Sequence, residues 1–214
     1  MTLKNRIGIL GTSGMAREAG NIAWELGLEP IYVALDEIEM TSWNYPAQII
    51  LEQNITQYTE MPYVIGIGES EVRKVVAERF KNRLKFINLI HPSATFGKAQ
   101  KEIIESCMGT IIAAGARLTS GISVGDFCIF NQNTTIAHDC LVGDFVHIGP
   151  GANVSGNVHL QDGCWIGAGA VINQGIYTKK LEIGKNTVIG SGAVVINDCV
   201  CNAVYVGTPA KRIK

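Results

Sequence analysis

His138 and Asp139 are adjacent in the chain, and together they form a pair suited to moving a proton. A free imidazole titrates at about pH 6.5, so it can accept a proton near neutral pH. A carboxylate beside it favours the imidazolium that forms and fixes the tautomer of the ring. The pair lies between Ile136 and Cys140, two positions of a repeat that should point into a core. We therefore expect the His138 side chain to face outward.

A second set of residues could bind an anion. Gly11-Thr12-Ser13-Gly14 follows a short apolar segment and precedes a helical one, so backbone N–H groups at the helix start would point at a ligand. The turn lacks the full G-x-G-x-x-G of dinucleotide enzymes. Asp36 comes at the end of the next apolar segment, where a carboxylate fits a ribose contact or a uracil contact equally well.

The remaining histidines and the cysteines favour structural interpretations. We read His159 as a surface residue and His91 as a positional residue of a linker. The chain has six cysteines without a CxxC pair or zinc-like spacing, so we expect no metal site. Four of them fall at small core positions of the repeat and are interpreted as buried packing residues: Cys128, Cys140, Cys164 and Cys199.

Alternating strands and helices are predicted for the first 90 residues. The apolar patterns indicate strands at 6–10, 30–35, 63–68 and 84–90, and helices at 15–26 and 69–81. Such alternation is typical of a small parallel sheet with Rossmann-like topology. The segment 37–61 has no clear pattern. We expect this domain to span residues 1–90, with a linker and entry segment at 91–111.

The second half repeats every six residues. An aliphatic or Phe residue recurs at each step, and four residues later comes a small or aliphatic one. The first series is Ile112, Leu118, Val124, Phe130, Ile136, Val142, Ile148, Val154, Leu160, Ile166, Ile172, Ile183, Ile189 and Val195. The second is Ala116, Ile122, Cys128, Thr134, Cys140, Val146, Ala152, Val158, Cys164, Ala170, Ile176, Thr187, Ala193 and Cys199.

A period of six fits neither a helix nor a half-buried strand. It fits a short strand plus a corner, so that three repeats close a triangular coil and coils stack as in a solenoid. We predict such a β-helix over residues 112–214. Glycine often follows the large residue, which we interpret as a bend with unusual dihedrals.

The repeat slips once, between Ile172 and Ile183. We predict that Thr178–Glu182 leaves the coil as a loop. Lys179 and Lys180 would then either meet an anionic ligand or form a solvated loop tip.

Composition excludes several classes of protein. Lys and Arg total 18 against 19 Asp and Glu, whereas nucleic-acid binding needs a clustered basic surface. No apolar run reaches the roughly 18 residues of a membrane span, and the first residues lack the features of a secretory signal. We expect a cytoplasmic protein without nucleic-acid or membrane partners.

Several motifs together carry a family resemblance. They are the Gly11-x-Ser13-Gly14 turn, Ile65-Gly66-Ile67-Gly68, Ile90-His91-Pro92-Ser93-Ala94, His138-Asp139-Cys140, the hexapeptide repeats, and Val206-Gly207-Thr208-Pro209-Ala210-Lys211. With them the chain resembles, nearly end to end, the left-handed β-helix sugar acetyltransferases, which include bacterial UDP-4-amino-sugar N-acetyltransferases and sialic acid O-acetyltransferases.

The resemblance implies a fold, an assembly and site roles. It implies a Rossmann-like α/β subdomain followed by a left-handed parallel β-helix, in a homotrimer with active sites between subunits. It assigns His138 as general base, supported by Asp139. It implies that acetyl-CoA contacts His147, Ala168 and Ser191, and that the nucleotide sugar contacts Ser13, Gly14, Met15, Asp36 and Gly68. Relatives often have His where this chain has Met15, and some have an acid where it has Leu35.

The implied activity is an acetyl-CoA-dependent N-acetyltransferase, with a UDP-4-amino-4,6-dideoxy sugar as expected acceptor and no metal. The thioester is already activated, so the acceptor can attack it directly. Three alternatives remain: O-acetylation of a sugar such as sialic acid, a nucleotide-dependent oxidoreductase, and a non-catalytic trimer.

Overall fold

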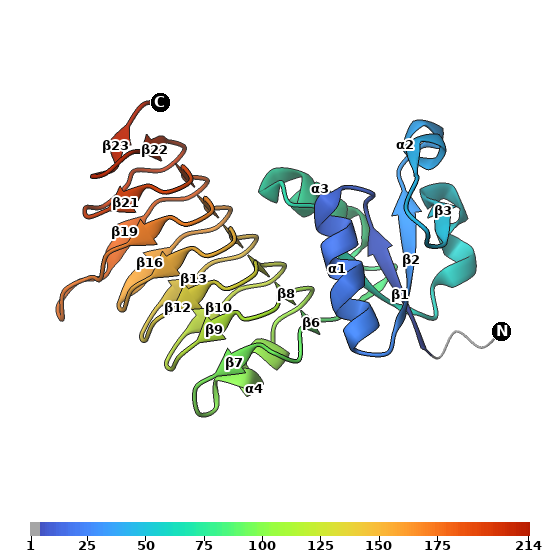
Figure 1. Cartoon of the computed structure of the whole chain (residues 1–214), viewed down its shortest axis with the longest axis horizontal. Coiled ribbons are helices and arrows are strands. Elements are labelled where there is room, and N and C mark those ends of the chain that lie inside the picture. The colour runs from blue at the N-terminus through green and yellow to red at the C-terminus, as the bar shows by residue number, and fades with distance from the viewer. Residues whose placement is uncertain (1–4) are drawn as a thin grey trace.

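The computed structural model describes residues 5–214. An α/β domain lies at one end of an elongated molecule and a triangular prism of stacked coils forms the rest (Figure 1). In this described part, no helix is both long enough and apolar enough to cross a bilayer.

The α/β domain is built on a parallel sheet with strand order β3-β2-β1-β4-β5. Its strands are β1 (Arg6–Leu10), β2 (Glu29–Ala34), β3 (Ile49–Leu51), β4 (Pro62–Ile65) and β5 (Lys85–Phe86). Its helices are α1 (Gly14–Glu25), α2 (Glu37–Ser42), the 3₁₀ helix η2 (Glu52–Tyr58) and α3 (Ser70–Phe80). The two predicted helices and the first three predicted strands of this domain are present, although the strand predicted at 63–68 ends at Ile65. The unassigned segment 37–61 contains α2, β3 and η2.

The strand predicted at 84–90 is wrong as a single element. Its first half, β5, pairs with β4 in the α/β sheet, and its second half, β6 (Leu89–Ile90), pairs with β8 in the prism. Asn88 marks the crossing, because its amide donates to the carbonyls of Ile104 and Cys107 and its carbonyl accepts from Thr110 N. The β-helix therefore begins within the segment that was expected to belong to the first domain.

Three parallel sheets form the sides of the prism. The first, here called the β14 face, contains β6, β8 (Ile111–Ile112), β11 (Ile129–Phe130), β14 (His147–Ile148), β17 (Trp165–Ile166), β20 (Val188–Ile189), β22 (Val204–Val206) and β23 (Lys211–Arg212). The β12 face contains β7 (Thr95–Phe96), β9 (Arg117–Leu118), β12 (Thr135–Ile136), β15 (Asn153–Val154), β18 (Val171–Ile172) and β21 (Val194–Val195). The β13 face contains β10 (Ser123–Val124), β13 (Leu141–Val142), β16 (Val158–Leu160) and β19 (Leu181–Ile183).

The predicted inward series fills the prism, which confirms the parallel β-helix. Successive coils pair 18 residues apart, as in Ile148 with Ile166. Both series are buried except for half-buried Val124 and for Ile176, which is 66% exposed. The four cysteines assigned to the core are buried there.

Two backbone features recur near the corners of the prism. The third residue after most large inward side chains has a positive φ, at Gly115, Gly121, Phe127, Asn133, Asp139, Phe145, Gly151, Asn157, Gly163, Gly169, Asn186 and Gly192. The glycines directly after the large residue, at 125, 143, 149, 167, 184 and 190, do not, so their predicted unusual dihedrals are wrong. They are needed for space: a Cβ on Gly143 would lie 2.7 Å from Asp162 N in the next coil.

The excursion is also shifted from its predicted position. Ile176 and Lys179 pair as a small antiparallel bridge around fully exposed Tyr177. Leu181 and Glu182, predicted to lie in the loop, are already back in the coil, because β19 pairs with β16.

Both ends of the prism are closed. At the first coils, α4 (Gln100–Glu105) places Ile104 in the prism core, and the buried Gln100 side chain pairs with both backbone groups of Ile122. At the last coil, β23 runs antiparallel to β22.

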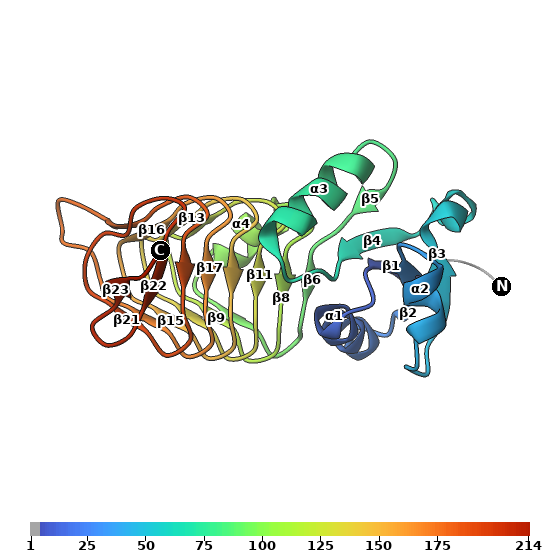
Figure 2. The ribbon, with the colours of Figure 1, turned by 90° about the horizontal axis from the view of Figure 1, so that it is seen from above.

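The two domains share apolar cores. One cluster joins Ile7 and Ile9 of β1 to Ile111 and Ile129 of the prism. Another places Phe127 among residues of β2, β4 and α3. Figure 2 shows α3 against the first coils. The α/β sheet is therefore held in a fixed position relative to the prism.

Candidate active site

A cavity of about 560 Å³ lies where the α/β sheet meets the β14 face. It is lined by Ser13, Gly14, Met15, Glu18, Ile67, Gly68, Glu69, Asn131, His147, Gly149, Pro150, Trp165, Ala168 and Ser191. Seven residues predicted for substrate or donor binding are therefore brought together: Ser13, Gly14, Met15, Gly68, His147, Ala168 and Ser191.

The α/β side of the cavity is the switch point of the sheet. β1 has β2 on one side and β4 on the other, so the chain leaves the carboxyl ends of β1 and β4 in opposite directions and a crevice opens between them. The turn to Ser13 follows β1, and Gly68 follows β4. This is the position at which open α/β sheets bind ligands.

The start of α1 offers unused hydrogen-bond donors. Ser13 is the N-cap, but its side chain makes no capping bond; its hydroxyl donates to Gly66 O at 3.3 Å. The first turn of α1 has no acidic residue, and nothing would lie within 4 Å of a Cβ on Gly14. The helix N-terminus is therefore open to an anion such as a phosphate. Met15 is largely buried in the apolar core and also lines the cavity.

His147 forms the opposite wall. Its side chain is buried, stacks on Trp165 with ring centroids 4.2 Å apart, and has Nδ1 3.0 Å from Gly68 O. Burial lowers the pKa of His147 to about 4, so the ring is neutral at neutral pH. Because a carbonyl only accepts, Nδ1 carries the hydrogen, and Nε2 is left as an acceptor.

Small residues continue this wall along the prism. Pro150, Ala168 and Ser191 occupy equivalent corner positions of three successive coils, linked by hydrogen bonds from Gly169 N to Pro150 O and from Gly192 N to Ala168 O. The excursion does not disturb them, since β17 pairs with β20 across it. An extended chain fits along such a row of short side chains.

His138 and Asp139 lie at a different corner. They follow β12 on the β12 face, whereas the cavity follows strands of the β14 face. His138 Nδ1 is 2.8 Å from Asp139 Oδ2, and both side chains are 66% exposed. The predicted outward orientation is confirmed. Within one chain, however, the pair does not line the cavity.

The surroundings of the pair hold it in place. The His138 ring covers Gly156, where a Cβ would lie 2.7 Å from the ring. Asp139 has a φ of 61°, a conformation that Asp and Asn tolerate better than most residues. Lys180 donates to the Asp139 carbonyl and to Asn157 Oδ1, so this lysine anchors the excursion beside the pair. Lys179 pairs with Asp198.

Comparisons with known proteins show which proteins this chain is similar to. Residues 6–80 match the PglD N-terminal domain family. The chain is 29% identical to GDP-perosamine N-acetyltransferase of Escherichia coli O157:H7, over 98% of this chain and 97% of that protein. Similar solved structures include WeeI from Acinetobacter baumannii AYE, with a TM-score of 0.86, 25% identity, and 97% and 99% coverage. The acetyltransferase domain of PglB from Neisseria gonorrhoeae FA1090, in complex with acetyl coenzyme A, has a TM-score of 0.84, 26% identity, and 98% and 99% coverage.

The resemblance to the hexapeptide-repeat sugar acetyltransferases is confirmed. The predicted enzyme class, an acyltransferase, is confirmed with it. The cavity between the two domains is thus the candidate active site of a sugar acetyltransferase.

Besides His138 and Asp139, one further predicted residue of this acetyltransferase, Asp36, lies outside the cavity lining. Asp36 is the N-cap of α2, and its Oδ1 accepts from Ile38 N and Glu39 N at 2.9 Å. The side chain is exposed at the same edge of the sheet as Ser13. In the structure, the Asp36 side chain caps the N-terminus of α2.

Seven lining residues of the acetyltransferase were not among the predicted site residues: Glu18, Ile67, Glu69, Asn131, Gly149, Pro150 and Trp165. Glu18 lies one turn after the Ser13 turn in α1. Asn131 and Trp165 belong to the β14 face, and an 18-residue spacing along the chain would have linked Asn131 to the corner of Gly149. Glu69 had no recognisable signal, because it falls in a helix cap.

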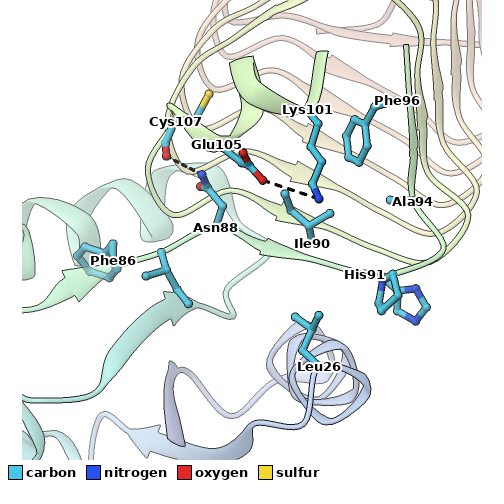
Figure 3. Close-up of a pocket in the computed structure, with 12 residues that line it drawn as sticks. Leu26, Phe86, Asn88, Ile90, His91, Ala94, Phe96, Lys101, Glu105 and Cys107 are labelled. Carbon is cyan, nitrogen blue, oxygen red and sulfur yellow. Dashed lines mark hydrogen bonds and ion pairs between the residues drawn. The ribbon is translucent and has the colours of Figure 1, made fainter. Parts of the chain in front are cut away.

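A larger hollow of the acetyltransferase lies elsewhere. It has a volume of about 630 Å³ and lies between Leu26 at the end of α1, the crossing at Asn88, and α4, as Figure 3 shows. His91 lies at its edge, where Nδ1 accepts from Ser93 N, in keeping with a positional role. This hollow lacks every predicted site residue, so we place the chemistry in the smaller cavity.

Proposed function

We propose that this chain is an acetyl-CoA-dependent N-acetyltransferase whose acceptor is a nucleotide-linked amino sugar. One observation supports this most: a single cavity joins an open helix N-terminus, suited to phosphate, to a row of small prism residues, suited to an extended acyl carrier. The E. coli relative is named for acetylation of a GDP-linked amino sugar, and the PglB domain is described with acetyl coenzyme A.

In this proposal the α/β domain binds the nucleotide. The N–H groups at the start of α1 hold the diphosphate, and Ser13, Gly14 and Gly68 line its path. We retain a UDP-linked 4-amino-4,6-dideoxy sugar as the first expectation. The name of the E. coli relative makes a GDP-linked amino sugar the second candidate.

The acyl donor would lie along the prism. Acetyl-CoA extends past Pro150, Ala168 and Ser191, with His147 beside its thioester end. The amine attacks the thioester carbonyl, and His138 takes the proton that the nitrogen loses. The C–S bond then breaks, and the leaving thiolate takes a proton from the imidazolium, which releases CoA as the thiol and restores neutral His138. Asp139 stabilises the imidazolium while it exists.

In this proposal, a second copy of the chain brings His138 to the cavity. In a homotrimer with cyclic symmetry, each interface is heterologous, so one corner of a prism meets a different corner of its neighbour. We propose that the His138 corner of one subunit completes the cavity of the next, which places the active sites between subunits.

A thiol-release assay tests the function. Acetyl-CoA would be offered with UDP- and GDP-linked amino sugars, their hydroxyl counterparts and sialic acid. We expect turnover only with a nucleotide-linked amine. Turnover only with hydroxyl acceptors would replace the proposal with O-acetylation, and tight NAD binding without acetyl-CoA binding would favour an oxidoreductase.

A further inference from the structure

Arg73, in the first turns of α3, is a buried guanidinium with an unusual set of partners. It is 1% exposed, and in the described residues no carboxylate forms an ion pair with it. Burial lowers its pKa to about 10, so the side chain stays charged at neutral pH. A buried charge without a counter-ion needs all its hydrogens bonded to be tolerated.

Backbone carbonyls supply those bonds. Nε donates to Phe127 O at 2.8 Å, and Nη2 donates to Phe145 O at 2.7 Å and to Val146 O at 3.5 Å. Nη1 donates to Ile67 O at 2.8 Å and to Gly68 O at 2.6 Å. The five donors of the guanidinium thus join two coils of the prism to the loop that follows β4.

The two prism partners are themselves exceptional. Phe127 and Phe145 have φ values of 54° and 58°, where most other corners of the prism use Gly, Asn or Asp. Bulky residues rarely adopt this conformation and persist there only when their surroundings enforce it. Their rings stack with centroids 5.3 Å apart. Arg73 binds the carbonyls of both and so supports the strained corners.

The Gly68 carbonyl links Arg73 to the cavity. It accepts from Arg73 Nη1 and also from His147 Nδ1. This second bond decides which nitrogen of His147 carries hydrogen. If the carbonyl turned away, Nδ1 would lose its acceptor and the ring could exchange tautomers.

We propose that Arg73 is a positioning residue for acetyl transfer: it fixes the Gly68 carbonyl so that His147 keeps its hydrogen on Nδ1 and offers Nε2 to the acyl donor. This rests on the proposed function. Arg73 does not touch the substrates; it acts through Gly68 and through the fit of the α/β domain against the prism.

The test compares Arg73→Lys with Arg79→Lys. Arg79 lies on the same helix but is exposed and pairs with Glu52, so its variant controls for a charge-conserving change in α3. We expect Arg73→Lys to lower kcat/KM for acetyl-CoA by about 10- to 100-fold, as misplacement of a reacting group does, and Arg79→Lys to leave it unchanged. Unchanged kcat/KM in a folded Arg73→Lys protein would overturn the proposal.

Ring ¹⁵N NMR separates positioning from mere stability. The His147 signals would be assigned by their loss in His147→Gln. The wild-type protein should show the neutral Nδ1–H tautomer at pH 7, and folded Arg73→Lys should show exchange between tautomers. A wild-type Nε2–H form or imidazolium overturns the proposal even if no Arg73 variant folds, as does an unaltered tautomer in folded Arg73→Lys.

The NMR result does not depend on finding the acceptor. If no sugar is acetylated by the wild-type protein, the proposed function fails while the tautomer still tests the role of Arg73. If the wild-type protein is active but the tautomer is insensitive to Arg73, the further inference alone fails.

Discussion

At the scale of single residues, two His–carboxylate pairs of the same geometry occur within residues 5–214. His138 Nδ1 is 2.8 Å from Asp139 Oδ2, and His159 Nδ1 is 2.8 Å from Glu182 Oε2. The second pair lies on the β13 face between β16 and β19. Hydrogen-bond geometry alone therefore does not mark a catalytic base; the surroundings must.

These pairs provide a matched mutational test. We expect His138→Ala to lower kcat by about 10²-fold or more, because a positioned base contributes that much, while His159→Ala retains kcat. Asp139→Asn should also lower kcat, and Asn tolerates the positive φ at this corner. Steady-state kinetics with acetyl-CoA would measure both. Equal losses in the His138 and His159 variants would contradict the assignment.

His147 makes a prediction about pH and stability. Its folded pKa of about 4 lies below the ordinary value of 6.5, so the unfolded chain binds the proton first. The contribution of His147 to the free energy of unfolding is therefore fully present above pH ~6.5. This contribution falls by about 3 kcal/mol as the pH decreases towards 4. Urea unfolding across this range would measure it. In His147→Gln, which retains a donor for Gly68 O, this part of the pH dependence should vanish.

At this scale, the sequence predicted interactions between side chains that are adjacent in the chain. Adjacent His138 and Asp139 show their partnership directly. The Gly68 carbonyl that orients His147 is 79 residues away, and a backbone oxygen has no signature in side-chain types. Arg73 was overlooked for the same reason, since all its partners are carbonyls.

At the scale of elements, the coil is held by close backbone contacts as well as by its apolar core. We expect Gly143→Ala to lower the free energy of unfolding by about 2 kcal/mol, because its Cβ would lie 2.7 Å from Asp162 N in the next coil. Gly151 is the matched control: it has a φ of 66° but open space around it, so Gly151→Ala should cost only about 1 kcal/mol. Denaturant titration of both variants would measure their free energies of unfolding. A larger loss in Gly151→Ala than in Gly143→Ala would contradict this account.

The period of six predicted the coils because every coil needs the same inward residues. It could not distinguish a glycine needed for dihedral freedom from one needed for space, since both follow the same spacing. It also could not reveal that β5 and β6 separate at Asn88. A continuous apolar segment at 84–90 has the same sequence pattern whether its residues form one strand or two strands in different sheets.

At the scale of the whole molecule, the proposed function divides the active site between two corners of the prism. Mixing two inactive variants tests whether neighbours complete each other. His138→Ala lacks the base, and Ala168→Trp would fill the groove with a large exposed side chain. If sites form between subunits, co-expressed trimers should regain about a quarter of wild-type activity, since one site in four would combine an intact base with an intact cavity.

Two controls are needed. The first is each variant expressed alone, and the second is a mixture of separately purified trimers that cannot exchange subunits. Co-expression without any recovery, from trimers shown by mass spectrometry to contain both variants, would place the whole site in one chain.

The closed ends of the prism have a further consequence. A stack of coils has two open edges, and on each edge another molecule could add its own coil and extend a filament without limit. Here α4 covers one edge, and on the other β23 presents two exposed cationic residues, Lys211 and Arg212, on a strand that reverses the ladder. At the edges that they occupy, α4 and β23 therefore hinder the addition of a further coil from another molecule.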